Sequence, residues 1–122
     1  MIRHALVAVS AAAALATAVS ASAAPKAVLL KGAVGPGFTI ALSKSGVKVR
    51  SLKPGTYKIV ISDRSSQHNF VLEKAKGGRF ERQITSVPFT GTKTFTVKLT
   101  PGKWEFYCAP HESAMRGEFT VK

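Results

Sequence analysis

The residues best suited to chemistry are two histidines, one cysteine and one methionine. After the first 23 residues they are the only members of their types. His68 stands alone, whereas Cys108, His111 and Met115 lie together in the segment 108–115. Two imidazoles and a thiolate with a weak axial thioether form the ligand set of blue-copper electron-transfer sites. The four side chains therefore predict a site for one copper ion that alternates between Cu(I) and Cu(II).

Each of these side chains, taken alone, has an ordinary structural explanation. An isolated histidine is often a surface or capping residue, a lone cysteine a small buried hydrophobe, and a methionine a filler of core gaps. Those explanations leave open why the Cys-x-x-His-x-x-x-Met pattern follows a strand-like segment. Zinc held by the same ligands is the main metal alternative. The sequence thus favours a metal site, with copper ahead of zinc.

An enzymatic interpretation is weaker. Cys108 and His111 could form a nucleophile–base pair, but such a pair needs an orienting group and an oxyanion site, and Asn69 is the only candidate. Copper oxidases and nitrite reductases need further copper ligands, for which no histidine remains. We therefore expect a protein that is not an enzyme.

The first 23 residues have the pattern of a secretory signal peptide. Arg3 and His4 precede an uncharged run, which ends in Ala21-Ser22-Ala23, a small-residue cleavage motif. Cleavage would leave residues 24–122 as one domain, periplasmic or extracellular, without a stable membrane span. The alternative is that the segment stays as an uncleaved anchor. In an exported protein a single cysteine needs a partner, a metal or a reactive role, which again favours metal binding by Cys108.

The chain is strongly basic. Lysine and arginine number 18 against six acidic residues, a formal charge of +12, and loss of Arg3 with the leader would lower it to +11. Because the basic residues are scattered along the chain, they are weak evidence for nucleic-acid binding, and we expect none. Such a surface either only keeps the protein soluble or attracts an acidic partner. We expect an acidic redox partner and a monomeric protein.

Short alternating segments separated by glycine, proline and polar turns predict an all-β fold. Tyr57, Ile59 and Ile61 share one face of a strand, and Trp104, Phe106 and Cys108 share one face of another. The expected strands are residues 39–42, 47–52, 57–62, 69–73, 83–86, 95–99, 104–108 and 117–121. The turn Thr100-Pro101-Gly102 is expected to join its two flanking strands as a hairpin. Seven or eight strands at this spacing predict a Greek-key β-sandwich.

The chain resembles the cupredoxins, the plastocyanin- and pseudoazurin-like blue-copper proteins. The resemblance rests on His68-Asn69-Phe70, on Cys108-Ala109-Pro110-His111 followed by Met115, and on the strand-turn-strand frame 95–106. It implies that His68, Cys108 and His111 bind copper in a plane, that Met115 is axial, and that Asn69 ties the two ligand loops together. Many relatives have serine or threonine where this chain has Ala109, so its ligand loop is expected to be looser or shifted in potential.

Two functions follow from the resemblance and the ligand set. A rigid site that holds both oxidation states would make the protein a one-electron carrier, with His111 as the exit toward a partner. Soft thiolate and thioether ligands also suit Cu(I), so an extracytoplasmic copper carrier or buffer is the alternative. The electron carrier is the favoured function, because four ligands anchored by a sandwich core favour a rigid site.

Overall fold

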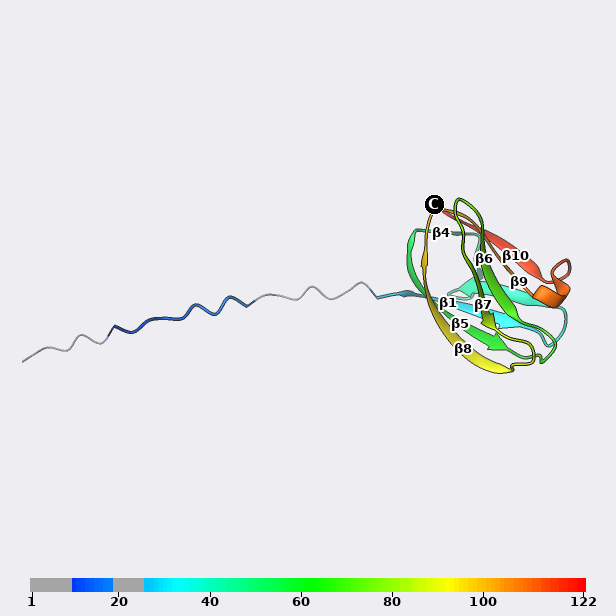
Figure 1. Ribbon diagram of the computed structural model, residues 1–122, viewed down its shortest axis with the longest axis horizontal. Coiled ribbons are helices and arrows are strands. Elements are labelled where there is room, and N and C mark those ends of the chain that lie inside the picture. Colours follow the sequence, from blue (N-terminus) through cyan, green and yellow to red (C-terminus); the bar gives the residue numbers. More distant parts are fainter. Residues whose placement is uncertain (1–9, 19–25) are drawn as a thin grey trace, which may run out of the picture.

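The computed structural model describes residues 10–18 and 26–122, and the second range forms two five-stranded sheets packed face to face (Figure 1). We call the first sheet A. It runs in the order β3 (Val47–Lys48), β2 (Ile40–Lys44), β1 (Val28–Val34), β5 (Gly55–Asp63) and β8 (Gly91–Leu99). Sheet B runs in the order β4 (Ser51–Leu52), β10 (Arg116–Val121), β9 (Gly102–Tyr107), β6 (Phe70–Lys76) and β7 (Glu81–Thr85). The predicted all-β sandwich is confirmed.

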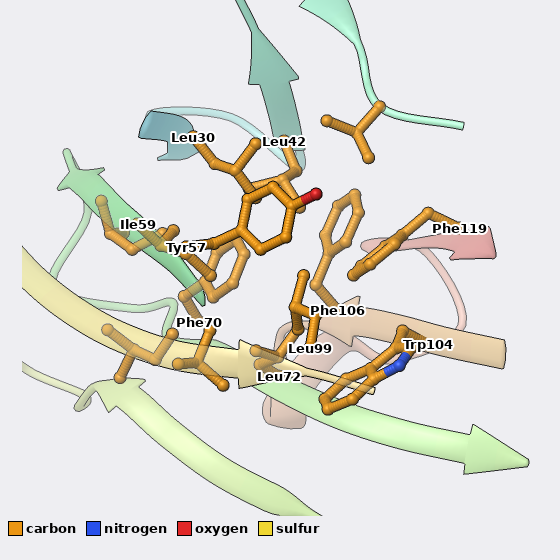
Figure 2. Close-up of a cluster of buried hydrophobic side chains, with 14 of the residues drawn as sticks. Leu30, Leu42, Tyr57, Ile59, Phe70, Leu72, Leu99, Trp104, Phe106 and Phe119 are labelled. Carbon is orange, nitrogen blue, oxygen red and sulfur yellow. The ribbon is translucent and has the colours of Figure 1, made fainter. Parts of the chain in front are cut away.

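The core lies between the two sheets and follows the alternation of the sequence. Tyr57, Ile59 and Ile61 point inward from β5 and are at most 4% exposed, while Trp104 and Phe106 point inward from β9. Figure 2 shows Tyr57 and Ile59 of sheet A meeting Trp104, Phe106 and Phe119 of sheet B in one cluster. Burial of this apolar surface is the main force that holds the sheets together. It gives the loops that carry the predicted ligands a packed base.

The strand count is ten within the described residues, not seven or eight. The sequence prediction missed β1, where Gly32 interrupts the apolar face and the pairing with β5 is parallel. It also treated residues 47–52 as one strand. The structure divides this segment into β3, which pairs with β2, and β4, which pairs with β10. Between them the buried Val49 donates its N–H to Leu42 O at 3.0 Å, and the chain crosses from sheet A to sheet B.

The predicted hairpin at Thr100-Pro101-Gly102 is wrong. β8 belongs to sheet A and β9 to sheet B, so the turn carries the chain across the sandwich instead of pairing its flanking strands. Trp104 Nε1 donates to Thr100 O at 2.9 Å and fixes this corner. Gly102 has φ +148°, and a Cβ there would lie 2.3 Å from Lys76 O, so no larger residue fits. Local turn signals cannot distinguish such a corner from a hairpin.

The N-terminal segment offers little structure to describe. Residues 10–18 have no regular secondary structure and are exposed. The expected cleavage motif at 21–23 lies outside the described residues, so the boundary between leader and domain stays a prediction. Within the described ranges, the model contains no helix of the length and apolarity that a membrane crossing requires.

Candidate metal centre

His68 is placed by the loop that joins β5 to β6, two residues before β6 begins. The loop turns back on itself: Ser65 N donates to Asp63 Oδ1 at 3.1 Å, and Gln67 N donates to Ser65 Oγ at 3.2 Å. His68 itself is 3% exposed. The loop therefore presents an imidazole inward at the end of the sandwich.

The other three predicted ligands come from the loop between β9 and β10. Cys108 continues the inward face of β9 and is fully buried, and a short 3-10 helix, η1 (Ala109–His111), follows it. Backbone hydrogen bonds close the loop at both ends. Cys108 N donates to Met115 O at 3.0 Å, and Met115 N donates to His111 O at 2.9 Å. In Figure 1 this segment, coloured orange, lies at one end of the sandwich.

Three donor atoms converge at this end. The Nδ1 atoms of His68 and His111 lie 3.1 Å apart, and each lies 3.7 Å from Cys108 Sγ. A metal bonded at about 2.0–2.1 Å to nitrogen and about 2.3 Å to sulfur, the lengths found at zinc, needs donor atoms roughly three to four ångströms apart. The triangle meets that requirement, and two imidazoles with one thiolate are the donor types that hold copper in blue-copper sites. The residues therefore fit a copper ion.

Met115 is placed differently from the other three. Its side chain is 1% exposed and belongs to the hydrophobic cluster that also contains Cys108. The structure brings its backbone against Cys108 and His111 through the hydrogen bonds described above. A buried thioether beside a buried thiol suits both an axial ligand and a core residue, so the axial role of Met115 stays a prediction.

Asn69 connects the two ligand loops, as the resemblance implied. Its Oδ1 accepts the N–H of Ala109 at 2.8 Å, which links the residue after His68 to the residue after Cys108. Its Nδ2 donates to Gln83 Oε1 on β7 at 3.2 Å. Asn69 is 3% exposed, so both ends of its amide are paired while buried. Sequence reasoning missed Gln83, because nothing in the local sequence marks a polar residue on an edge strand as a neighbour of this site.

Phe38 was also missed. It lies in the loop between β1 and β2, and it is 64% exposed although its ring contacts both histidines. The ring centroid lies 5.4 Å from that of His68 and 4.9 Å from that of His111, in an edge-on arrangement with the latter. The sequence signal was present, since a lone aromatic follows the turn Gly35-Pro36-Gly37. Phe38 covers the imidazoles on the solvent side.

Tyr107, next to Cys108, carries no charge at neutral pH. Its hydroxyl donates to Glu81, and burial together with this neighbouring carboxylate raises the pKa of Tyr107 above its ordinary value of 10.0. The position next to the ligand is a neutral hydrogen-bond donor that links β9 to β7.

Comparisons with known proteins agree with this geometry. Solved structures similar to the chain include rusticyanin from Thiobacillus ferrooxidans at 1.27 Å, with a TM-score of 0.54 and 24% identity over 81% of this chain and 79% of that one. Reduced rusticyanin at 1.9 Å matches with a TM-score of 0.54 and 22% identity over 82% of each chain. At this identity the likeness concerns the fold. No curated protein sequence matches significantly.

The family assignment comes from the sequence itself. Residues 38–122 match the family of copper binding proteins described as the plastocyanin/azurin family. The match includes Phe38, both ligand loops and every strand from β2 to β10. The chain belongs to the plastocyanin/azurin family of copper-binding proteins, the cupredoxins.

Proposed function

We propose that the protein is an exported one-electron carrier, not an enzyme, that holds one copper ion through His68, Cys108 and His111 with Met115 as the axial ligand. The observation that carries the proposal is the convergence of two imidazole nitrogens and one thiol at the buried end of a cupredoxin sandwich. Copper bound there would supply the one-electron step by alternating between Cu(I) and Cu(II).

The protein's own contribution is to hold the donor atoms in fixed positions and to exclude water from them. Cys108 is fully buried, and His68 and Met115 are at most 3% exposed. The hydrogen bonds that close the 108–115 loop, together with the Asn69–Ala109 bond, limit how far the loops can separate. A donor set that moves little between oxidation states suits electron transfer better than metal release.

We propose that the electron passes between copper and a partner protein through His111. Of the three converging residues it is the one that is only partly buried, whereas His68 and Cys108 are buried. Exposed Phe38, Pro110 and Ala114 border it and give this end an apolar surface. A partner that packs on this surface would reach the His111 imidazole at short range. We propose an acidic redox protein as that partner, because of the net positive charge.

Export is supported by the leader pattern and by the lone cysteine. We propose that residues 1–23 are removed and that residues 24–122 form the mature domain. The position of β1, which begins at Val28, leaves the whole sandwich within that domain. N-terminal sequencing of protein from the extracytoplasmic fraction would test the boundary, and an intact N-terminus would contradict it.

A spectrum and a competition experiment test the function. The mature protein with one equivalent of Cu(II) should become intensely blue or green, because charge transfer from a short, in-plane thiolate bond is strong. The copper should stay bound through repeated chemical reduction and reoxidation, and Cu(I) should pass only slowly to a competing chelator. A colourless one-to-one complex would refute the copper site proposed here. Rapid and complete transfer of Cu(I) to a chelator of moderate affinity would favour a copper carrier.

A further inference from the structure

The edge strand β7 reaches the ligand-bearing segments through two side chains. Gln83 Oε1 accepts from Asn69 Nδ2 at 3.2 Å, and Thr85 Oγ1 accepts from Phe70 N at 2.9 Å. Asn69 and Phe70 directly follow His68 in the chain. Because Asn69 Oδ1 also accepts the Ala109 N–H, β7 is connected to one ligand loop directly and to the other through a single amide.

A β-bulge brings these two side chains to the ligand end of the sheet. Phe70 pairs with Thr85 but Val71 pairs with Gln83, so Ile84 is an extra residue in β7. A regular antiparallel ladder would place Gln83 opposite Leu72, one position farther from Asn69. Bulges are frequent beside functional sites, where they redirect a side chain. Here the bulge moves Gln83 toward the Asn69 amide.

The Asn69 amide depends on this contact for its orientation. The group is buried, so its NH₂ needs an acceptor, and Ala109 offers only a methyl side chain. Gln83 Oε1 supplies that acceptor. Without it, the buried NH₂ would have no acceptor among the described residues, and only the Ala109 N–H would hold the amide in this orientation. The bond that ties the two ligand loops would then be weakened.

We propose that Gln83 is a positioning residue of the copper centre: it holds the Asn69 amide in the one orientation that ties the Cys108–Ala109 segment to His68. The proposal rests on the proposed function, because it concerns the site that copper would occupy. Among the described residues, the side-chain hydrogen bond of Gln83 goes to Asn69 and not to the three converging residues, so Gln83 acts through Asn69. Its effect is to keep the thiol and the first imidazole at a fixed separation.

Three variants test the proposal. Gln83→Leu removes the acceptor with little change in size, and Gln83→Glu keeps an acceptor at the same reach. Gln67→Leu is the matched control, because Gln67 adjoins His68 but, among the described residues, forms its hydrogen bond through the backbone. Gln83 and Gln67 are both exposed, so all three variants should fold. Unfolding curves of the variants check this directly.

The first measurement needs no metal. In the copper-free protein, Gln83→Leu should accelerate hydrogen exchange of the Ala109 amide roughly tenfold, the factor that corresponds to the net stability of about one hydrogen bond. It should also shift the resonances of the Asn69 side-chain NH₂. Gln83→Glu should restore protection, and Gln67→Leu should match the wild type. Equal Ala109 exchange in Gln83→Leu and Gln67→Leu would overturn the proposal.

The second measurement uses the copper-loaded protein. Gln83→Leu should release Cu(I) to a chelator roughly tenfold faster and shift both the reduction potential and the thiolate-to-copper absorption, and Gln83→Glu should restore the slow release. A Gln83→Leu protein with the potential and release rate of Gln67→Leu would refute the positioning role. If the wild type binds no copper, the proposed function fails, whereas the exchange data on the copper-free protein still decide whether Gln83 orients Asn69.

Discussion

The two sheets of the sandwich carry different charges. Sheet A has exposed lysines on its outer face, and its one acidic residue, Asp63, is buried. Sheet B carries four of the six acidic residues in a single row, because Glu73 lies opposite both Glu81 and Glu105, and Glu105 lies opposite Glu118. Arg116 and Lys103 pair with this row. The net positive charge is therefore unbalanced on sheet A and partly neutralised on sheet B.

The predicted metal ligands are also distributed unequally between the two sheets. The predicted ligands are attached to the ends of β6, β9 and β10, all in sheet B, whereas sheet A contributes Phe38 from the loop between β1 and β2. The positive face and the electron-transfer site thus belong to different layers. Substitutions on sheet A should change how a partner approaches, and substitutions in sheet B should change the site itself.

The largest expected effect is the loss of the thiolate from sheet B. Cys108→Ser should abolish the intense colour even where some copper stays bound, because a hydroxyl cannot supply the strong sulfur-to-copper charge transfer. Absorption spectra at one equivalent of Cu(II) measure it. The steering charge of sheet A is unaltered in this variant. Retention of the colour would mean that Cys108 is not a ligand.

The placement of three predicted ligands in one loop could be anticipated from the sequence for a physical reason. Cys108, His111 and Met115 are local in the chain, and the strand alternation that ends at Cys108 places its thiol inward, as observed. The contacts of Phe38 and Gln83 were not accessible, because each depends on chain segments that only the tertiary fold brings together. The same holds for the corner at Gly102, where the close approach of the Lys76 carbonyl leaves no room for a Cβ.

The second-largest effect is expected from charge reversal on sheet A. Lys31, Lys58 and Lys98 project from the outer faces of β1, β5 and β8, and all three are exposed. Replacing all three with glutamate should slow electron transfer to an acidic partner roughly tenfold at low salt, because long-range attraction is lost. The difference should shrink as ionic strength rises, since salt screens exposed charges.

The control for that prediction changes the same charge on the other layer. Lys76, Arg79 and Lys122 are exposed at sheet B or its turns, and their replacement with glutamate alters the net charge equally. Stopped-flow rates across ionic strength compare the two triple variants. A larger loss in the sheet A variant supports steering by that face. Equal losses would show that only the net charge matters.

A smaller effect is expected from Met115 in the site itself. Met115→Leu should keep copper and colour, because an axial thioether bond is long and weak, and it should raise the reduction potential by removing a donor that favours Cu(II). Voltammetry and absorption spectra measure both. An unchanged spectrum and potential would identify Met115 as a core residue only.

The smallest effect concerns the glutamate row of sheet B. Burial, followed by a hydrogen bond and like charge from Glu105, raises the pKa of Glu73 above its ordinary value of 4.5. The folded state thus binds this proton more tightly than the unfolded state, and the contribution of Glu73 to stability falls as pH rises above 4.5 through the folded pKa. Glu73→Gln should therefore stabilise the fold at pH 7 by less than about 1 kcal/mol, the scale of one unfavourable cross-strand pair. The gain should vanish near pH 4, where the carboxyl is protonated. Urea unfolding at both pH values in the same metal state measures it. An equal gain in stability at both pH values would mean that repulsion within the glutamate row does not cause the gain.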